Sequence, residues 1–226
     1  MARRERKQVQ DALPVARYAA RVSELQRTHE WPYWARFALL LVGLFLYGLS
    51  IRLQLDAAVG LAPWEAFHQG LARHTGLSIG MVSVLIGLLL LALAWAALKV
   101  RPGVGSVLNM LLVGLFIDLL APLTPHPEGR ILQWGQFAAG LLLLGLATGT
   151  YIASHMGAGP RDGTILGLAA VTGRPVARVR AVIELVVLGF GLLLGGQVGF
   201  GTLAFALGAG PAMSLGLRLY GLNRKE

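Results

Sequence analysis

The chain of 226 residues is 55% hydrophobic and only 14% charged, with a formal net charge of +9 and no cysteine. Because soluble domains carry about a quarter charged residues, this composition indicates a membrane protein. The lack of cysteine excludes disulfides, thiolate metal sites and thiol catalysis. The positive charge gathers where a membrane protein keeps its cytoplasmic loops, so it does not indicate binding to nucleic acid.

The first 33 residues form a basic segment with no apolar core before Trp34, which excludes a cleaved secretory signal. Apolar residues from Val15 to Leu25 recur at helical spacing, with arginines on the other face. This pattern fits a short helix on the anionic membrane surface, and a solvated basic tail is the alternative.

Apolar runs after this segment predict an all-α membrane protein with six transmembrane helices. The predicted spans are 34–55, 77–98, 106–120, 131–154, 175–194 and 201–220. Two shorter helices, 62–74 and 160–171, begin near prolines. Each would rise only about 20 Å, too little for a full crossing, so we expect them to be re-entrant or interfacial.

One stretch occurs twice. The pattern Gly-x-x-Pro-x-acid at 60–65 returns ninety-seven residues later at 157–162, and each copy is followed by Thr-Gly. Internal repeats of this kind predict two copies of one unit. The predicted parts are a tail (1–33), a first membrane repeat (34–122), a linker (123–131), a second repeat (132–221) and a C-terminal tail (222–226).

The charges predict the orientation. With both termini in the cytoplasm and six crossings, all of the twenty Lys and Arg except Arg52, Arg73 and Arg130 lie on or near the cytoplasmic side. This asymmetry is what the positive-inside rule requires. Since three spans per repeat is an odd number, the two repeats would be inverted, which is a recurring design of transporters. The predicted location is the bacterial inner (cell) membrane.

The two repeated tips form the candidate binding site. Helix N-termini direct N–H groups and partial positive charge at whatever lies before them, which favours an anionic or carbonyl-bearing ligand. The candidate substrate-binding residues at the tips are Pro63, Trp64, Glu65, Pro160, Arg161 and Asp162. A structural alternative for both acids is helix capping, because a carboxylate in the first turn complements the helix dipole.

Asn109 and Asp118 complete the candidate substrate-binding set, because polar groups within a span are costly and usually face a cavity. Asp118 lies near the end of its span, so it could instead reach the interface. The spacing of Arg180 and Glu184 predicts an ion pair along one helix. The sequence contains no order of nucleophile and base, phosphate loop or metal-ligand spacing, so we expect no enzyme, cofactor or metal site.

The Gly-x-x-Pro-[Trp/Arg]-[Glu/Asp] tips and the stretch from Gly103 to Asp118 resemble the YczE/YitT group of bacterial integral membrane proteins. The resemblance covers residues 36 to 221. It implies a multi-spanning protein without implying a particular substrate.

These features favour a small-solute secondary transporter or channel-like permease, embedded in the bilayer and acting on an unknown, anionic solute. The first alternative is a non-transporting scaffold whose basic tail recruits a cytoplasmic partner, and the second is a lipid-handling protein. The glycine-rich helix faces are also suited to a homodimer.

Overall fold

The computed structural model describes residues 31–157 and 159–222, and within them all regular secondary structure is α-helical, as predicted. In chain order the helices are α3 (Tyr33–Ala57), α4 (Pro63–Thr75), α5 (Ile79–Ala96), α6 (Val104–Leu119), α7 (Arg130–Ala153), α8 (Pro160–Thr172), α9 (Val176–Leu193) and α10 (Phe200–Leu219). Each lies within about two residues of its predicted range. The helix predicted between Val15 and Leu25 lies outside the described residues.

Local chemistry sets the ends of the two short helices. Pro63 and Pro160 occupy the first turns of α4 and α8, where a missing N–H costs nothing. Gly76 and Gly173 end these helices with φ of 71° and 65°, the left-handed conformation that glycine adopts without strain. Proline and glycine therefore bound both helices at thirteen residues.

Four of the described helices, α3, α5, α7 and α10, are long and apolar enough to cross a membrane. Helix α6 has 16 residues and is shorter than these, and α9 has 18 residues but includes Arg178, Arg180 and Glu184. Large apolar side chains such as Leu185 and Leu207 are about 70% exposed on the helix surfaces. Such exposed apolar surface is suited to contact with lipid.

The loops that precede the two short helices have the same backbone geometry. Ala58 and His155 have φ of 56° and 54°, and Gly60 and Gly157 have φ of 129° and 126°. Members of each pair are ninety-seven residues apart, the spacing of the sequence repeat. Unrelated loops rarely share two left-handed positions at the same spacing, because residues other than glycine seldom adopt them.

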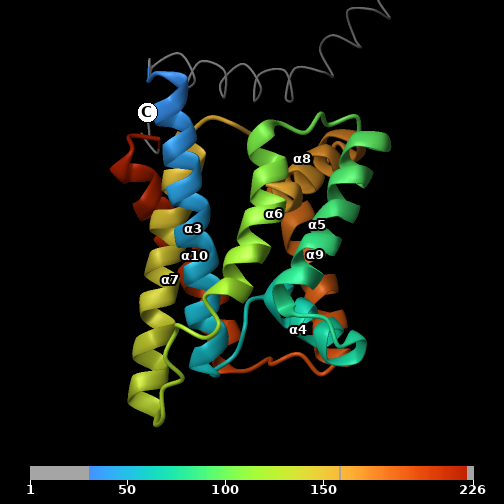
Figure 1. The fold of residues 1–226 in the computed structure, drawn as a ribbon. Coiled ribbons are helices and arrows are strands. Elements are labelled where there is room, and N and C mark those ends of the chain that lie inside the picture. Colours follow the sequence, from blue (N-terminus) through green and yellow to red (C-terminus); the bar gives the residue numbers. More distant parts are fainter. Residues whose placement is uncertain (1–30, 158, 223–226) are drawn as a thin grey trace, which may run out of the picture. The chain divides into compact units, whose positions relative to one another are not determined.

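The same two loops receive equivalent hydrogen bonds from the other half of the chain. The backbone N–H of Gly105 donates to the carbonyl of Met156 (2.8 Å), and that of Gly201 donates to the carbonyl of Val59 (2.9 Å). Each short helix also packs against a helix of the other half of the chain. Helix α4 packs against α9, and α8 packs against α5. Figure 1 shows α4 and α8 near opposite ends of the helices that surround them.

The helix pairs α5–α6 and α9–α10 differ, although they occupy equivalent positions in the repeat. Helix α5 packs closely on α6, and a side-chain carbon at Gly114 would overlap the backbone of Gly80. Gly210, the repeat counterpart of Gly114, has no atom within 4 Å of such a carbon. Within the described residues, α9 has no comparable packing against α10.

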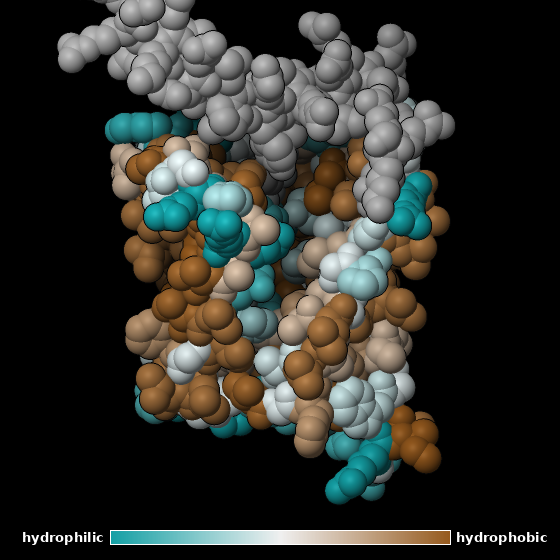
Figure 2. All heavy atoms as spheres, turned by 180° about the vertical axis from the view of Figure 1, so that it is seen from behind, coloured by the Kyte–Doolittle hydropathy of each residue, from teal (hydrophilic) through white to brown (hydrophobic). Residues whose placement is uncertain are grey.

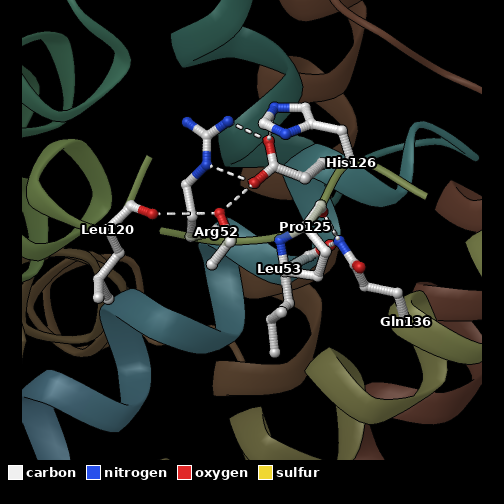
Figure 3. Close-up of polar contacts among 8 residues, drawn as sticks. Arg52, Leu53, Leu120, Pro125, His126 and Gln136 are labelled. Atoms are coloured by element: carbon white, nitrogen blue, oxygen red, sulfur yellow. Dashed lines mark hydrogen bonds and ion pairs between the residues drawn. The ribbon is translucent and has the colours of Figure 1, made fainter. Parts of the chain in front are cut away.

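A polar network fixes the connection between α6 and α7 to the end of α3 (Figure 3). Asp56 accepts hydrogen bonds from Arg52, four residues earlier in α3, and from Thr124, and Nε2 of His126 lies 3.2 Å from its Oδ1. Gln136 donates to one carbonyl of α3 (3.1 Å) and one of the connecting segment (2.9 Å). The contacts with Arg52, Thr124 and His126 replace the water that the buried Asp56 carboxylate loses on folding.

Candidate functional site

The N-terminal turns of α4 and α8 meet. Nη1 of Arg161 donates to Oε1 of Glu65 over 2.9 Å, and the guanidinium carbon lies 5.0 Å from the centroid of the Trp64 ring. Three predicted site residues from the two halves of the chain are therefore in contact. The Glu65 side chain is only 10% exposed, so removing its partner would leave an uncompensated charge.

Asp162 lies beside this pair and has partners of its own. It accepts hydrogen bonds from the hydroxyl of Tyr151 (3.2 Å) and from Nη2 of Arg180 (3.1 Å). Arg180 also donates to Glu184 (3.1 Å), which confirms the ion pair that their spacing predicts. Asp162 is also the acidic residue in the first turn of α8, where a carboxylate complements the helix dipole.

A cavity of about 50 Å³ adjoins the first turn of α8. This is space for a few water molecules. Helices α3 to α8 all contribute to its wall. The polar lining residues are Tyr47, His68, Ser83, Asn109, Tyr151, Arg161 and Asp162. The cavity therefore has a polar wall within a chain whose outer surface is largely apolar.

The first turn of α8, from Gly159 to Asp162, borders this cavity. The backbone bond from Gly163 to the carbonyl of Gly159 (2.9 Å) opens the helical pattern. The N–H groups of Arg161 and Asp162 precede that bond and so have no intrahelical partner. Asn109 lies close by, since a side-chain carbon at Gly159 would come within 3.2 Å of its Oδ1.

His68 is a site residue that the sequence analysis missed. Its side chain lines the cavity and is buried, with 1% exposure. Its Nε2 has no hydrogen-bond partner among the described residues. A buried polar atom without a partner is costly, so this nitrogen marks a place where a further molecule would bind favourably.

Known proteins resemble most of this chain. A model described as "Family of unknown function (DUF6198)" matches residues 34–217. The chain belongs to this family. It is 33% identical over 186 residues to "Uncharacterized membrane protein YczE" of Bacillus subtilis (strain 168), which covers 80% of this chain and 85% of the relative. It is 34% identical over 182 residues to an "Uncharacterized protein" of Haemophilus influenzae (strain ATCC 51907 / DSM 11121 / KW20 / Rd), covering 80% and 83%.

The match confirms the resemblance to YczE, and the relative's name agrees with the membrane character of the four long apolar helices. No solved structure gives a significant match. The DUF6198 match includes every residue of the cavity wall, from Tyr47 to Asp162.

Four predicted site residues of this DUF6198 chain do not line the cavity: Pro63, Trp64, Glu65 and Asp118. Trp64 and Glu65 lie next to it through their contacts with Arg161. Pro63 begins α4 and is half-buried. Asp118 accepts hydrogen bonds from the hydroxyl of Ser78 and from the N–H of Gly80 (2.9 Å). These donors lie at the start of α5, so Asp118 stabilises the N-terminus of that helix.

The missed residues carried a weak signal in the sequence. His68 stands where the other repeat has Ile165, and Tyr47 stands where it has Leu144. At both positions, a polar residue of the first repeat that lines the cavity stands opposite an apolar counterpart. Asn109, which the analysis did select, has the apolar counterpart Phe205.

Proposed function

We propose that this DUF6198 protein is a small-solute permease of the bacterial inner membrane, with its binding site between the starts of α4 and α8. The observation that carries the proposal is the polar cavity where these two helix ends meet, next to the Glu65–Arg161 pair. Within a bilayer, irregular backbone is tolerated where protein or a water-filled cavity satisfies it. Broken helices that meet near the membrane centre are where secondary transporters bind their solutes.

We also propose that the two halves are inverted three-helix repeats with six crossings and both termini in the cytoplasm. The matched loop geometry and the exchanged packing of α4 and α8 support this arrangement. Thr75 and Thr172 are matched, exposed positions at the ends of the short helices. Because the chain has no native cysteine, a single cysteine at either position reports one side of the membrane.

Thr75→Cys should react with an impermeant maleimide added outside intact cells, and Thr172→Cys should react only after permeabilisation. Inverted repeats place equivalent points on opposite sides of the membrane. Labelling of both positions from the same side would contradict the inversion. It would favour the scaffold function over the permease.

The difference between the α5–α6 and α9–α10 pairs supports alternating access. If the repeats exchange roles, the second state has α9 packed on α10 and α5 parted from α6. Figure 2, the reverse of Figure 1, shows hydrophilic side chains in a recess between hydrophobic flanks. We propose that this recess is the open side of the present state, and that its opposite closes at Gly80 and Gly114.

The two acids at the helix starts would couple solute movement to protons or bind a cation, and Arg161 would bind an anionic group. Proteoliposomes with the double variant Glu65→Gln and Asp162→Asn should lose at least about tenfold of the uptake rate for small carboxylates, a barrier change near 1.4 kcal/mol. Glu128→Gln, an exposed acid in the α6–α7 connection, is the control and should retain the full rate. Unchanged uptake in the double variant would remove these acids from the site.

A further inference from the structure

Several hydrogen-bonding groups border the cavity. The N–H groups of Arg161 and Asp162 precede the helical bonds of α8, and the buried Nε2 of His68 has no partner among the described residues. The amide of Asn109 lies against the same helix start. A molecule with two oxygen atoms would satisfy the helix N–H groups and the imidazole together, because an oxygen acceptor suits each of them.

The charges around the cavity leave no cation free for an added anion. Glu65 pairs with Arg161, and Arg180 is shared by Asp162 and Glu184. An added anion would leave an uncompensated negative charge where the dielectric is low, which is costly unless another acid becomes neutral. Glu65 is the acid in question, because its carboxylate already occupies the Arg161 guanidinium that an incoming carboxylate would bind.

The contact between Glu65 and Arg161 is also one that a ligand can replace. Arg161 comes from one half of the chain and Glu65 from the other, and a single hydrogen bond of 2.9 Å joins them. The Arg161 side chain is 26% exposed and rests on the face of Trp64. Trp64 would hold the guanidinium in place through its cation–π contact when Glu65 withdraws.

We propose that the cavity binds a small carboxylate, which displaces Glu65 from Arg161 while Glu65 takes up one proton. The inference rests on the permease function proposed above and specifies its substrate. One carboxylate oxygen accepts from Arg161 and the start of α8, and the other accepts from Nε2 of His68. The volume near 50 Å³ suits a molecule on the order of two carbon atoms. Solute and proton cross together, so no net charge moves.

Three probes separate the parts of this proposal. Glycolate carries the carboxylate, glycolamide carries the carbonyl without the charge, and chloride carries the charge without the carbonyl. Binding is measured as a rise in the melting temperature of the purified full-length protein in detergent. Transport is measured in proteoliposomes as uptake of radiolabelled probe, with an internal pH indicator and a potential-sensitive dye.

Glycolate should stabilise the protein and enter the vesicles with one proton and no change in membrane potential. His68→Ala should weaken glycolate binding about tenfold, the loss expected for one hydrogen bond to a charged group, and His68→Gln should restore part of it. Glu65→Gln should still bind glycolate but should no longer carry protons. The control is Ile165→Ala, the buried counterpart of His68 in the other repeat, which should leave glycolate affinity unchanged.

Each of the other outcomes shows which part of the proposal is wrong. Glycolate binding without uptake would overturn the permease function and leave the carboxylate site standing. Uptake that His68→Ala leaves unchanged would overturn the site and leave the permease standing. Equal transport of glycolamide, or transport of chloride in place of glycolate, would overturn the carboxylate assignment. Neither binding nor uptake of glycolate would overturn both.

Discussion

Replacing Gly145 by valine should prevent the protein from folding. Helices α7 and α10 approach so closely that a side-chain carbon at Gly145 would overlap the carbonyl of Ala212, and one turn later Gly149 meets Gly216 in the same way. Small residues permit this contact between helix backbones, and a larger side chain would force the helices apart. The expected loss is about 3 kcal/mol or more, within a margin of stability that is itself small. Gel filtration and thermal unfolding in detergent would measure it.

Gly135→Val provides the matched control for this prediction. Gly135 lies in the same helix, but a side-chain carbon there has no atom within 4 Å. Replacing glycine by valine has the same effect on helix propensity at both positions, so any difference in stability between the two variants reports packing alone. A Gly145→Val protein as stable as Gly135→Val would show that α7 and α10 do not pack through this face.

Joining α5 to α6 should stop transport reversibly. An ideal side-chain carbon at Gly87 lies 3.5 Å from Cβ of Met110, which suits a disulfide. In the cysteine-free chain, Gly87→Cys with Met110→Cys should cross-link quickly under mild oxidation. Uptake should fall to background and return on reduction, because the second state proposed above requires these helices to part.

The matched pair in the other repeat, Glu184→Cys with Ala206→Cys, tests whether that second state exists. Its helices are not packed together in this structure, so a disulfide should form only slowly, as the protein visits the state in which they meet. In a chain with all four cysteines, either disulfide should exclude the other. Simultaneous formation of both would contradict the exchange of roles, and so would rapid linkage of the second pair alone.

The short helices were the most predictable elements of the fold, since proline and glycine act on the backbone locally. Pro63 and Gly76 bound α4 through their own dihedral preferences, whatever surrounds them. The spans were less certain. Helix α9 was expected as a membrane crossing, yet its three charged residues separate it from the four apolar helices. The hydropathy of a stretch of sequence does not show which of its charged side chains pair with residues of neighbouring helices.

The candidate site was predicted only in part. Trp64, Glu65 and Arg161 were selected because both copies of the repeat bear a helix start at that point, and they do meet. The link from Asp162 to Tyr151 and the empty bonding position of His68 could not be predicted. Both depend on which helices become neighbours in space, and that information is spread over the whole chain. Asp118 was selected by polarity alone, which does not distinguish a helix cap from a ligand.

The crossed packing of the short helices delays completion of the fold while the chain is synthesised. Helix α4 packs against α9, which follows it about a hundred residues later, so at ribosomal speed the wait is on the order of ten seconds. Throughout that interval Glu65 has no Arg161 to bind, and the loop before α4 lacks the N–H of Gly201. The nascent first half must therefore remain near water or the insertion machinery, and it becomes a finished membrane structure only when the second half arrives.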